Sequence, residues 1–83
     1  MVDEQVKQKL IRLAAKVQGR STTYLENTKL ASVLDAKRPA TRDAVKEVLA
    51  EGLQKPVSDI GRILASADDD RVIDEIVKAL LSK

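Results

Sequence analysis

The sequence predicts an all-α protein: a compact bundle of about five short helices in a single domain spanning residues 1–83. Apolar residues recur at steps of three and four, which is the spacing of one helix face, and no convincing strand pattern appears. Helix-start and helix-stop residues divide the chain into segments of ordinary helix length. The chain is also near the smallest size that forms a core without disulfides or metals, so one domain is expected.

The first helix is predicted from about Asp3 to Gln18, with Gly19 ending it. Its apolar face consists of Val6, Leu10, Leu13 and Val17. Basic residues at similar spacing form a stripe: Lys9, Arg12, Lys16 and Arg20. Such a stripe is either the solvated face of the helix or a surface that contacts phosphates.

The second helix is predicted to begin near Thr23, which forms a capping-box pattern with Glu26, and to end at about Ala36. Asn27 is a competing start.

The third helix is predicted from Pro39 or Thr41 to Glu51. Proline suits the first position of a helix, where its missing N–H costs nothing. Gly52, just beyond, is a helix-stop signal.

A loop around Pro56 leads to a fourth helix, predicted from about Val57 to Ala65, and a fifth follows from about Arg71 to Leu81, capped by the aspartates of residues 68–70. The apolar stripe of the fifth helix is wider than a surface helix requires. It indicates either the central helix of the bundle or a homodimer interface. The predicted interface residues are Val72, Ile73, Ile76, Val77 and Leu80.

Composition removes several classes of function. The chain has no cysteine and no histidine, and Tyr24 is its one aromatic residue. We therefore expect no disulfide, metal site, cofactor or stacking surface for single strands. We also expect no enzyme, because histidine and cysteine, the usual bases and nucleophiles, are absent. The one carboxylate cluster, at 68–70, lacks the spacing of a calcium loop and is typical of a helix N-terminus. The apolar runs are too short for a membrane span or signal peptide, which predicts a cytoplasmic protein.

Charge is unevenly distributed along the chain. Through Lys46 there are ten Lys/Arg and five Asp/Glu, whereas from Glu47 onward there are five and eight. The basic half either faces a polyanion or reflects an imbalance that arises by chance.

Residues 28–53 predict a helix-turn-helix, two short helices meeting at a tight corner with arginines at the start of the second. The second helix of this motif is the predicted helix from Pro39 or Thr41 to Glu51. Its residues expected to pack inward are Thr41, Ala44, Val45 and Val48, and those expected to point outward are Pro39, Arg42, Asp43 and Lys46. The predicted DNA contacts are Lys37, Arg38, Arg42 and Lys46. Arginine suits bidentate contact with guanine, and the lysines would contact phosphates.

The same segment resembles the helix-turn-helix of GntR-type winged-helix transcriptional regulators. The matching residues are Leu30-Ala31, Leu34, Arg38-Pro39, Arg42-Asp43-Ala44-Val45 and Glu51-Gly52-Leu53. The resemblance implies that Arg38 and Arg42 contact DNA, and that Asp35 stands at the usual turn glycine. The sequence departs from the family where the β-hairpin wing should follow Gly52, because residues 54–62 contain no paired strands.

The sequence therefore predicts a small helix-turn-helix protein that binds duplex DNA, as a transcriptional or plasmid- or phage-type regulator, and that forms a homodimer. The alternative is a helical protein–protein interaction module, serving as an adaptor or for dimerisation, that binds no nucleic acid.

Overall fold

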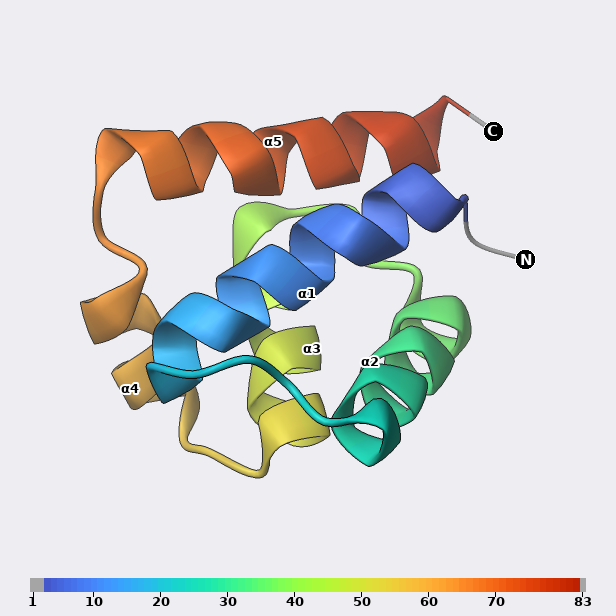
Figure 1. The fold of residues 1–83 in the computed structure, drawn as a ribbon. Helices are drawn as coiled ribbons and strands as arrows, with labels where there is room; N and C mark the ends of the chain where they lie inside the picture. Colours follow the sequence, from blue (N-terminus) through green and yellow to red (C-terminus); the bar gives the residue numbers. More distant parts are fainter. Residues whose placement is uncertain (1–2, 83) are drawn as a thin grey trace.

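The computed structural model describes residues 3–82 and contains no strand within that range, which confirms the predicted all-α class. Its helices are α1 (Glu4–Gln18), α2 (Tyr24–Lys37), α3 (Arg42–Leu53), α4 (Val57–Ile63) and α5 (Ala67–Leu81). In Figure 1, α1 crosses the front of the molecule, α5 lies along the top, α2 and α4 lie to either side, and α3 is behind α1. Both α1 and α3 contact all four other helices, so these two helices together form the centre of the bundle.

Aliphatic side chains from all five helices form one core. The helices contribute unequally. Five side chains of α1 are buried, whereas α2, which is almost as long, buries only Leu30 and Leu34. Helix α2 therefore contributes fewer buried side chains to the core than α1, and it packs mainly on α3.

The helix starts and stops of α1 and α2 follow the local signals in the sequence. The Asp3 carboxylate accepts a hydrogen bond from the Gln5 N–H, and Gly19 ends α1 in the left-handed conformation with φ of 71°. At α2, Thr23 and Glu26 form the predicted capping box, so the competing start at Asn27 is not used. These predictions are confirmed.

The connection between α2 and α3 differs from the prediction. Pro39 is buried and precedes α3, which begins at Arg42, so its expected outward position in the first turn is wrong. Thr41 is exposed instead of packing inward, because its hydroxyl caps α3 by accepting from the Ala44 N–H at 3.1 Å. The left-handed residue is Arg38, with φ of 44°, and Asp35 lies inside α2.

Gly52 is not a helix stop. It lies inside α3, which continues to Leu53 and ends at Gln54 in the left-handed conformation with φ of 57°. A Cβ atom at Gly52 would lie 2.5 Å from Leu30 Cδ2. The absence of a side chain at Gly52 therefore makes room for Leu30 and lets α2 approach α3 closely.

The last two helices have shifted boundaries. Helix α4 ends at Ile63, before the predicted Ala65, and α5 begins at Ala67, before the predicted Arg71. The cap of α5 is Ser66, whose side chain forms a capping box with Asp69, so the three aspartates lie within the first turn of the helix. Their negative charge is favourable there because the N-terminal end of a helix is partially positive.

Candidate functional site

Arg42, predicted to contact DNA, is bound to acids of α5. Its Nε and Nη2 atoms donate to the two carboxylate oxygens of Asp74, both at 2.7 Å, and Nη1 lies 3.8 Å from Asp70 Oδ2. The bidentate hydrogen bond from Arg42 lowers the pKa of Asp74 and raises the pKa of the guanidinium. Arg42 would have to break this pair to bind a base edge or a phosphate with the same donors.

Of the other three residues predicted to contact DNA, one forms an ion pair within residues 3–82 and two do not. Lys37 Nζ lies 3.3 Å from Glu51 Oε2 of α3. The side chains of Arg38 and Lys46 form no hydrogen bond or ion pair within residues 3–82. Two of the four predicted cations therefore have no partner among residues 3–82.

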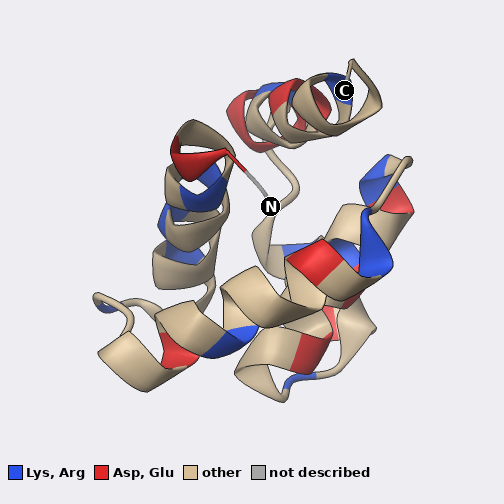
Figure 2. Ribbon diagram, turned by 90° about the vertical axis from the view of Figure 1, so that its right-hand side faces the viewer, with Lys and Arg blue, Asp and Glu red and all other residues tan. Residues whose placement is uncertain are grey.

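The outward face of α3 carries an acidic ridge. Asp43, Glu47 and Glu51 are all exposed and follow one another at steps of four residues, which places them in line on one face. A helix that enters the major groove approaches phosphates on both sides, and these carboxylates would be repelled by them. In Figure 2, basic and acidic segments of the ribbon are interspersed on the side in view.

The basic stripe of α1 is largely neutralised within the chain. Lys9 Nζ lies 3.2 Å from Glu75 of α5, and Lys16 Nζ donates to Asp69 Oδ2 at 2.6 Å. Of the four stripe residues, only Arg12 has no partner among residues 3–82, because Arg20 binds the Glu26 carboxylate with both Nη atoms at 3.1 Å. This arrangement favours the solvated-face interpretation of the stripe.

Two of these carboxylates have strongly favoured charged forms. Hydrogen bonds from Arg20, from the Thr23 backbone and from Gln18 lower the pKa of Glu26 to about 2. Burial alone would raise the pKa of Asp69, but the hydrogen bonds from Lys16 and Ser66 outweigh it and lower the pKa. Both groups join separate helices, which gives them a structural role.

The residues predicted for a dimer interface lie mostly inside the single chain. Ile73 and Ile76 are fully buried and Leu80 is buried, while Val72 and Val77 are partly buried against the same core. The three buried residues are unavailable to a second copy. Packing of α5 on α1 and α3 within the single chain thus accounts for much of its apolar stripe. The helix is not the central helix of the bundle, so that prediction is wrong, and the homodimer stays a prediction.

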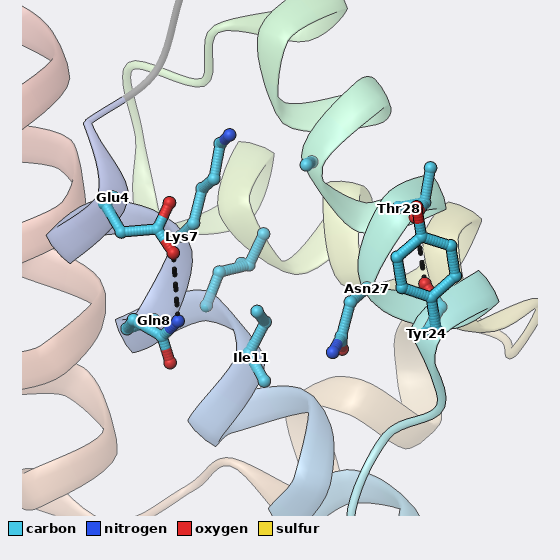
Figure 3. A pocket seen from close by; sticks show the side chains of 9 residues that line it. Glu4, Lys7, Gln8, Ile11, Tyr24, Asn27 and Thr28 are labelled. Carbon is cyan, nitrogen blue, oxygen red and sulfur yellow. Dashed lines mark hydrogen bonds between the residues drawn. The ribbon is translucent and has the colours of Figure 1, made fainter.

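A groove between α1 and α2 was not predicted. It has a volume of about 310 Å³ and an apolar floor of Leu10, Ile11 and Ala31. Polar side chains form the rim: Glu4, Lys7, Gln8, Asn27 and Thr28. In Figure 3, Ile11 and Asn27 face one another across it, and Tyr24 stands at its α2 side.

Two large apolar side chains flank this groove at the start of α2. Tyr24 is 81% exposed and Leu25 is 77% exposed. Tyr24 lines the α1–α2 groove, while Leu25 lines a second hollow, of about 200 Å³, between α2 and the end of α3. The first turn of α2 therefore presents an aromatic and an aliphatic side chain between two hollows.

The sequence does carry a signal for this surface. In α2, apolar residues are spread around the helix and do not form one stripe, so some of them must face away from the core.

Other kinds of site receive no support from the described part of the chain. Residues 3–82 contain no group of three or more acidic side chains placed to hold a metal ion. None of the helices described has the length and apolar character needed to cross a membrane.

Comparison with known proteins identifies no matching family model, no similar curated protein and no similar solved structure. The resemblance of residues 30–53 to GntR-type regulators therefore stays a prediction from those residues alone.

Proposed function

We propose that this protein is a helical protein–protein interaction module that binds a peptide segment of another protein in the α1–α2 groove. The observation that carries the proposal is the exposure of Tyr24 at a groove that is also lined by Leu10, Ile11 and Ala31. Aromatic and aliphatic side chains that stay exposed next to a hollow are typical of binding surfaces, where such residues supply most of the affinity.

The dimensions of the groove support a peptide ligand. A volume of about 310 Å³ is at the lower end of the range for small-molecule sites, and the groove is open to solvent along its rim. It accommodates one or two side chains of a partner segment. Tyr24 and Thr28 can then contact the backbone and flanking residues of that segment.

Binding of duplex DNA by a small regulator is the competing function. It is supported by the unpaired side chains of Arg38 and Lys46. Against it stand the pairing of Arg42 with Asp74 and the acidic ridge of α3, both of which oppose approach to phosphates. The test therefore measures peptide binding and DNA binding in parallel.

The test is a selection of short random peptides displayed on phage against the immobilised protein and two variants. Ala31→Arg fills the groove from its floor, whereas Ala36→Arg places the same side chain on an exposed position of the same helix outside the groove. We expect the wild type and Ala36→Arg to enrich the same peptides, and Ala31→Arg to lose them. Circular dichroism and thermal unfolding check that both variants fold.

A parallel titration with random duplex DNA at low salt completes the test. We expect no affinity that falls with salt in the way that release of counterions requires. Enrichment that survives in Ala31→Arg, or no enrichment at all together with salt-dependent DNA binding, would overturn the proposal.

A further inference from the structure

Lys7 is the one lysine or arginine among the described residues that line the α1–α2 groove. It is partly buried, and its ammonium group forms no hydrogen bond or ion pair within residues 3–82. The other lysines of α1, Lys9 and Lys16, each have a carboxylate of α5 within 3.2 Å and 2.6 Å respectively. Lys7 is therefore a cation in a groove that lacks the partner its neighbours have.

The acid that lines the same groove does not serve as that partner. The Glu4 carboxylate accepts a hydrogen bond from Gln8 Nε2 at 3.1 Å and forms no ion pair with Lys7. In Figure 3 the Lys7 side chain extends along the groove, away from the hydrogen bond between Glu4 and Gln8. Because the Gln8 amide is neutral, Glu4 keeps its negative charge, and Lys7 is the one positive side chain among residues 3–82 that lines the groove.

We infer that the segment bound in the α1–α2 groove carries a carboxylate beside an aliphatic anchor, and that Lys7 receives this carboxylate. The inference rests on the proposed function. The anchor would pack on Leu10, Ile11 and Ala31, and an adjacent Asp or Glu side chain would pair with the ammonium group. Because Lys7 is partly shielded from water, a charge-assisted hydrogen bond there is stronger than one on an open surface.

The experiment compares the peptides selected by the wild type with those selected by Lys7→Glu, and by Lys29→Glu as a matched control. Lys29 is also an unpaired lysine, but it lies on the other side of α2, in the hollow lined by Leu25. We expect the wild type and Lys29→Glu to select an acidic residue next to an aliphatic one. Lys7→Glu is expected to select a basic residue in its place.

Affinity measurements on the best synthetic peptide sharpen the result. By fluorescence polarisation, we expect Lys7→Glu to weaken binding about tenfold, which corresponds to one charge-assisted contact. The same peptide with its acid replaced by lysine should regain affinity for Lys7→Glu. Lys7→Gln should bind both peptides similarly, and circular dichroism checks the fold of each variant.

The outcomes separate this inference from the proposed function. Peptides that require the groove, as judged by Ala31→Arg, but show no acidic preference or the same preference in Lys7→Glu, overturn the inference and leave the function standing. If nothing is selected and light scattering shows a dimer that Ala31→Arg dissociates, a second copy occupies the groove, and both are overturned.

Discussion

The two sides of α1, one facing α5 and the other facing α2, differ in how their lysines are paired and in how closely the neighbouring helix packs. On the α5 flank, Lys9 and Lys16 meet Glu75 and Asp69, and the helices share a buried aliphatic seam. On the α2 flank, Lys7 has no partner among the described residues and the two helices are separated by an open groove. Towards α5, Lys9 and Lys16 of α1 are therefore paired. Towards α2, the groove is open and Lys7 has no partner among residues 3–82, although the two helices are joined beyond it by the hydrogen bond from Gln18 to Glu26.

This difference explains the uneven charge of the chain. The acids of α5 neutralise bases of α1 and α3, through the pairs of Lys9, Lys16 and Arg42. The basic N-terminal part and the acidic C-terminal part of the sequence thus bind one another, and the imbalance needs no external polyanion.

The largest effect should come from emptying the packed side. Ile76→Ala removes a fully buried side chain of α5 and should lower the free energy of unfolding by about 2–5 kcal/mol, since a cavity remains. Leu25→Ala makes a comparable truncation on the open side, where the side chain is 77% exposed, and should change stability by less than about 0.5 kcal/mol. Urea denaturation measures both.

Protein concentration provides the control for this pair. If Ile76 stabilises the single chain alone, the unfolding midpoint should not depend on concentration, whereas stabilisation through a dimer makes it rise with concentration. Equal losses for Ile76→Ala and Leu25→Ala would contradict the distinction between the two flanks.

A second effect concerns how closely α2 is held. Gly52→Ala would place a Cβ atom 2.5 Å from Leu30 Cδ2, and this overpacking should cost about 1–3 kcal/mol, reduced by the better helix propensity of alanine. Gly61→Ala, in α4, has nothing within 4 Å of the new Cβ and should stabilise by about 0.5–1 kcal/mol. Thermal unfolding of the two variants should shift in opposite directions. A stabilised Gly52→Ala would mean that α2 moves away from α3 at little cost.

Predictions from local signals were accurate where the signal acts within one turn. The helix stop at Gly19 and the capping box of Thr23 and Glu26 each depend on residues no more than a few positions apart. Where two local signals compete for one helix start, neither signal alone predicts the first residue of the helix. Pro39 was suited to a first helical turn, but Thr41 provided a side-chain cap and determined the start of α3.

The site depended on contacts that spacing along the chain does not reveal. Arg42 and Asp74 are 32 residues apart, and Lys16 and Asp69 are 53 apart. Helix periodicity predicts that Arg42 faces outward, and the side chain is exposed. The acids that bind it belong to α5, so the spacing of residues within its own helix does not reveal them. The groove likewise arises from the relative placement of α1 and α2. Only the exposed Tyr24 and Leu25 left a trace in the sequence, as apolar residues outside a helix stripe.

A smaller loss is expected when the charge pairing on the α5 flank is broken. Lys16→Met leaves the buried Asp69 carboxylate with its Ser66 hydrogen bonds alone and should cost about 1 kcal/mol near neutral pH, because Lys16 is half exposed and partly screened. The pKa of Asp69 in the folded protein lies below its ordinary value of 3.8. This stabilisation is therefore present above pH 3.8 and is lost as pH falls through the folded pKa. The difference between wild type and Lys16→Met, measured by urea denaturation, should shrink on acidification. A difference that is constant with pH would show that Lys16 acts through packing and not through charge.

The smallest change in stability is expected for Arg42→Ala, and it separates the two interpretations of this arginine. The pair with Asp74 lies on the surface, where exposed ion pairs contribute little to stability. In the variant, the pKa of the Asp74 carboxyl should return towards its ordinary value, since the hydrogen bond from Arg42 is the main cause of its lowering. An NMR titration of the carboxyl carbon measures that shift. Arg42→Lys is the matched control, because a lysine keeps the positive charge but loses the bidentate geometry, so it should restore only part of the shift.

If Arg42 instead reads DNA, the wild type should bind duplex in a salt-dependent manner and Arg42→Ala should weaken that binding roughly tenfold or more. Because one guanidinium fork cannot hold Asp74 and a guanine edge with the same donors, a wild type that binds duplex should also release Asp74 and raise its pKa when DNA is added.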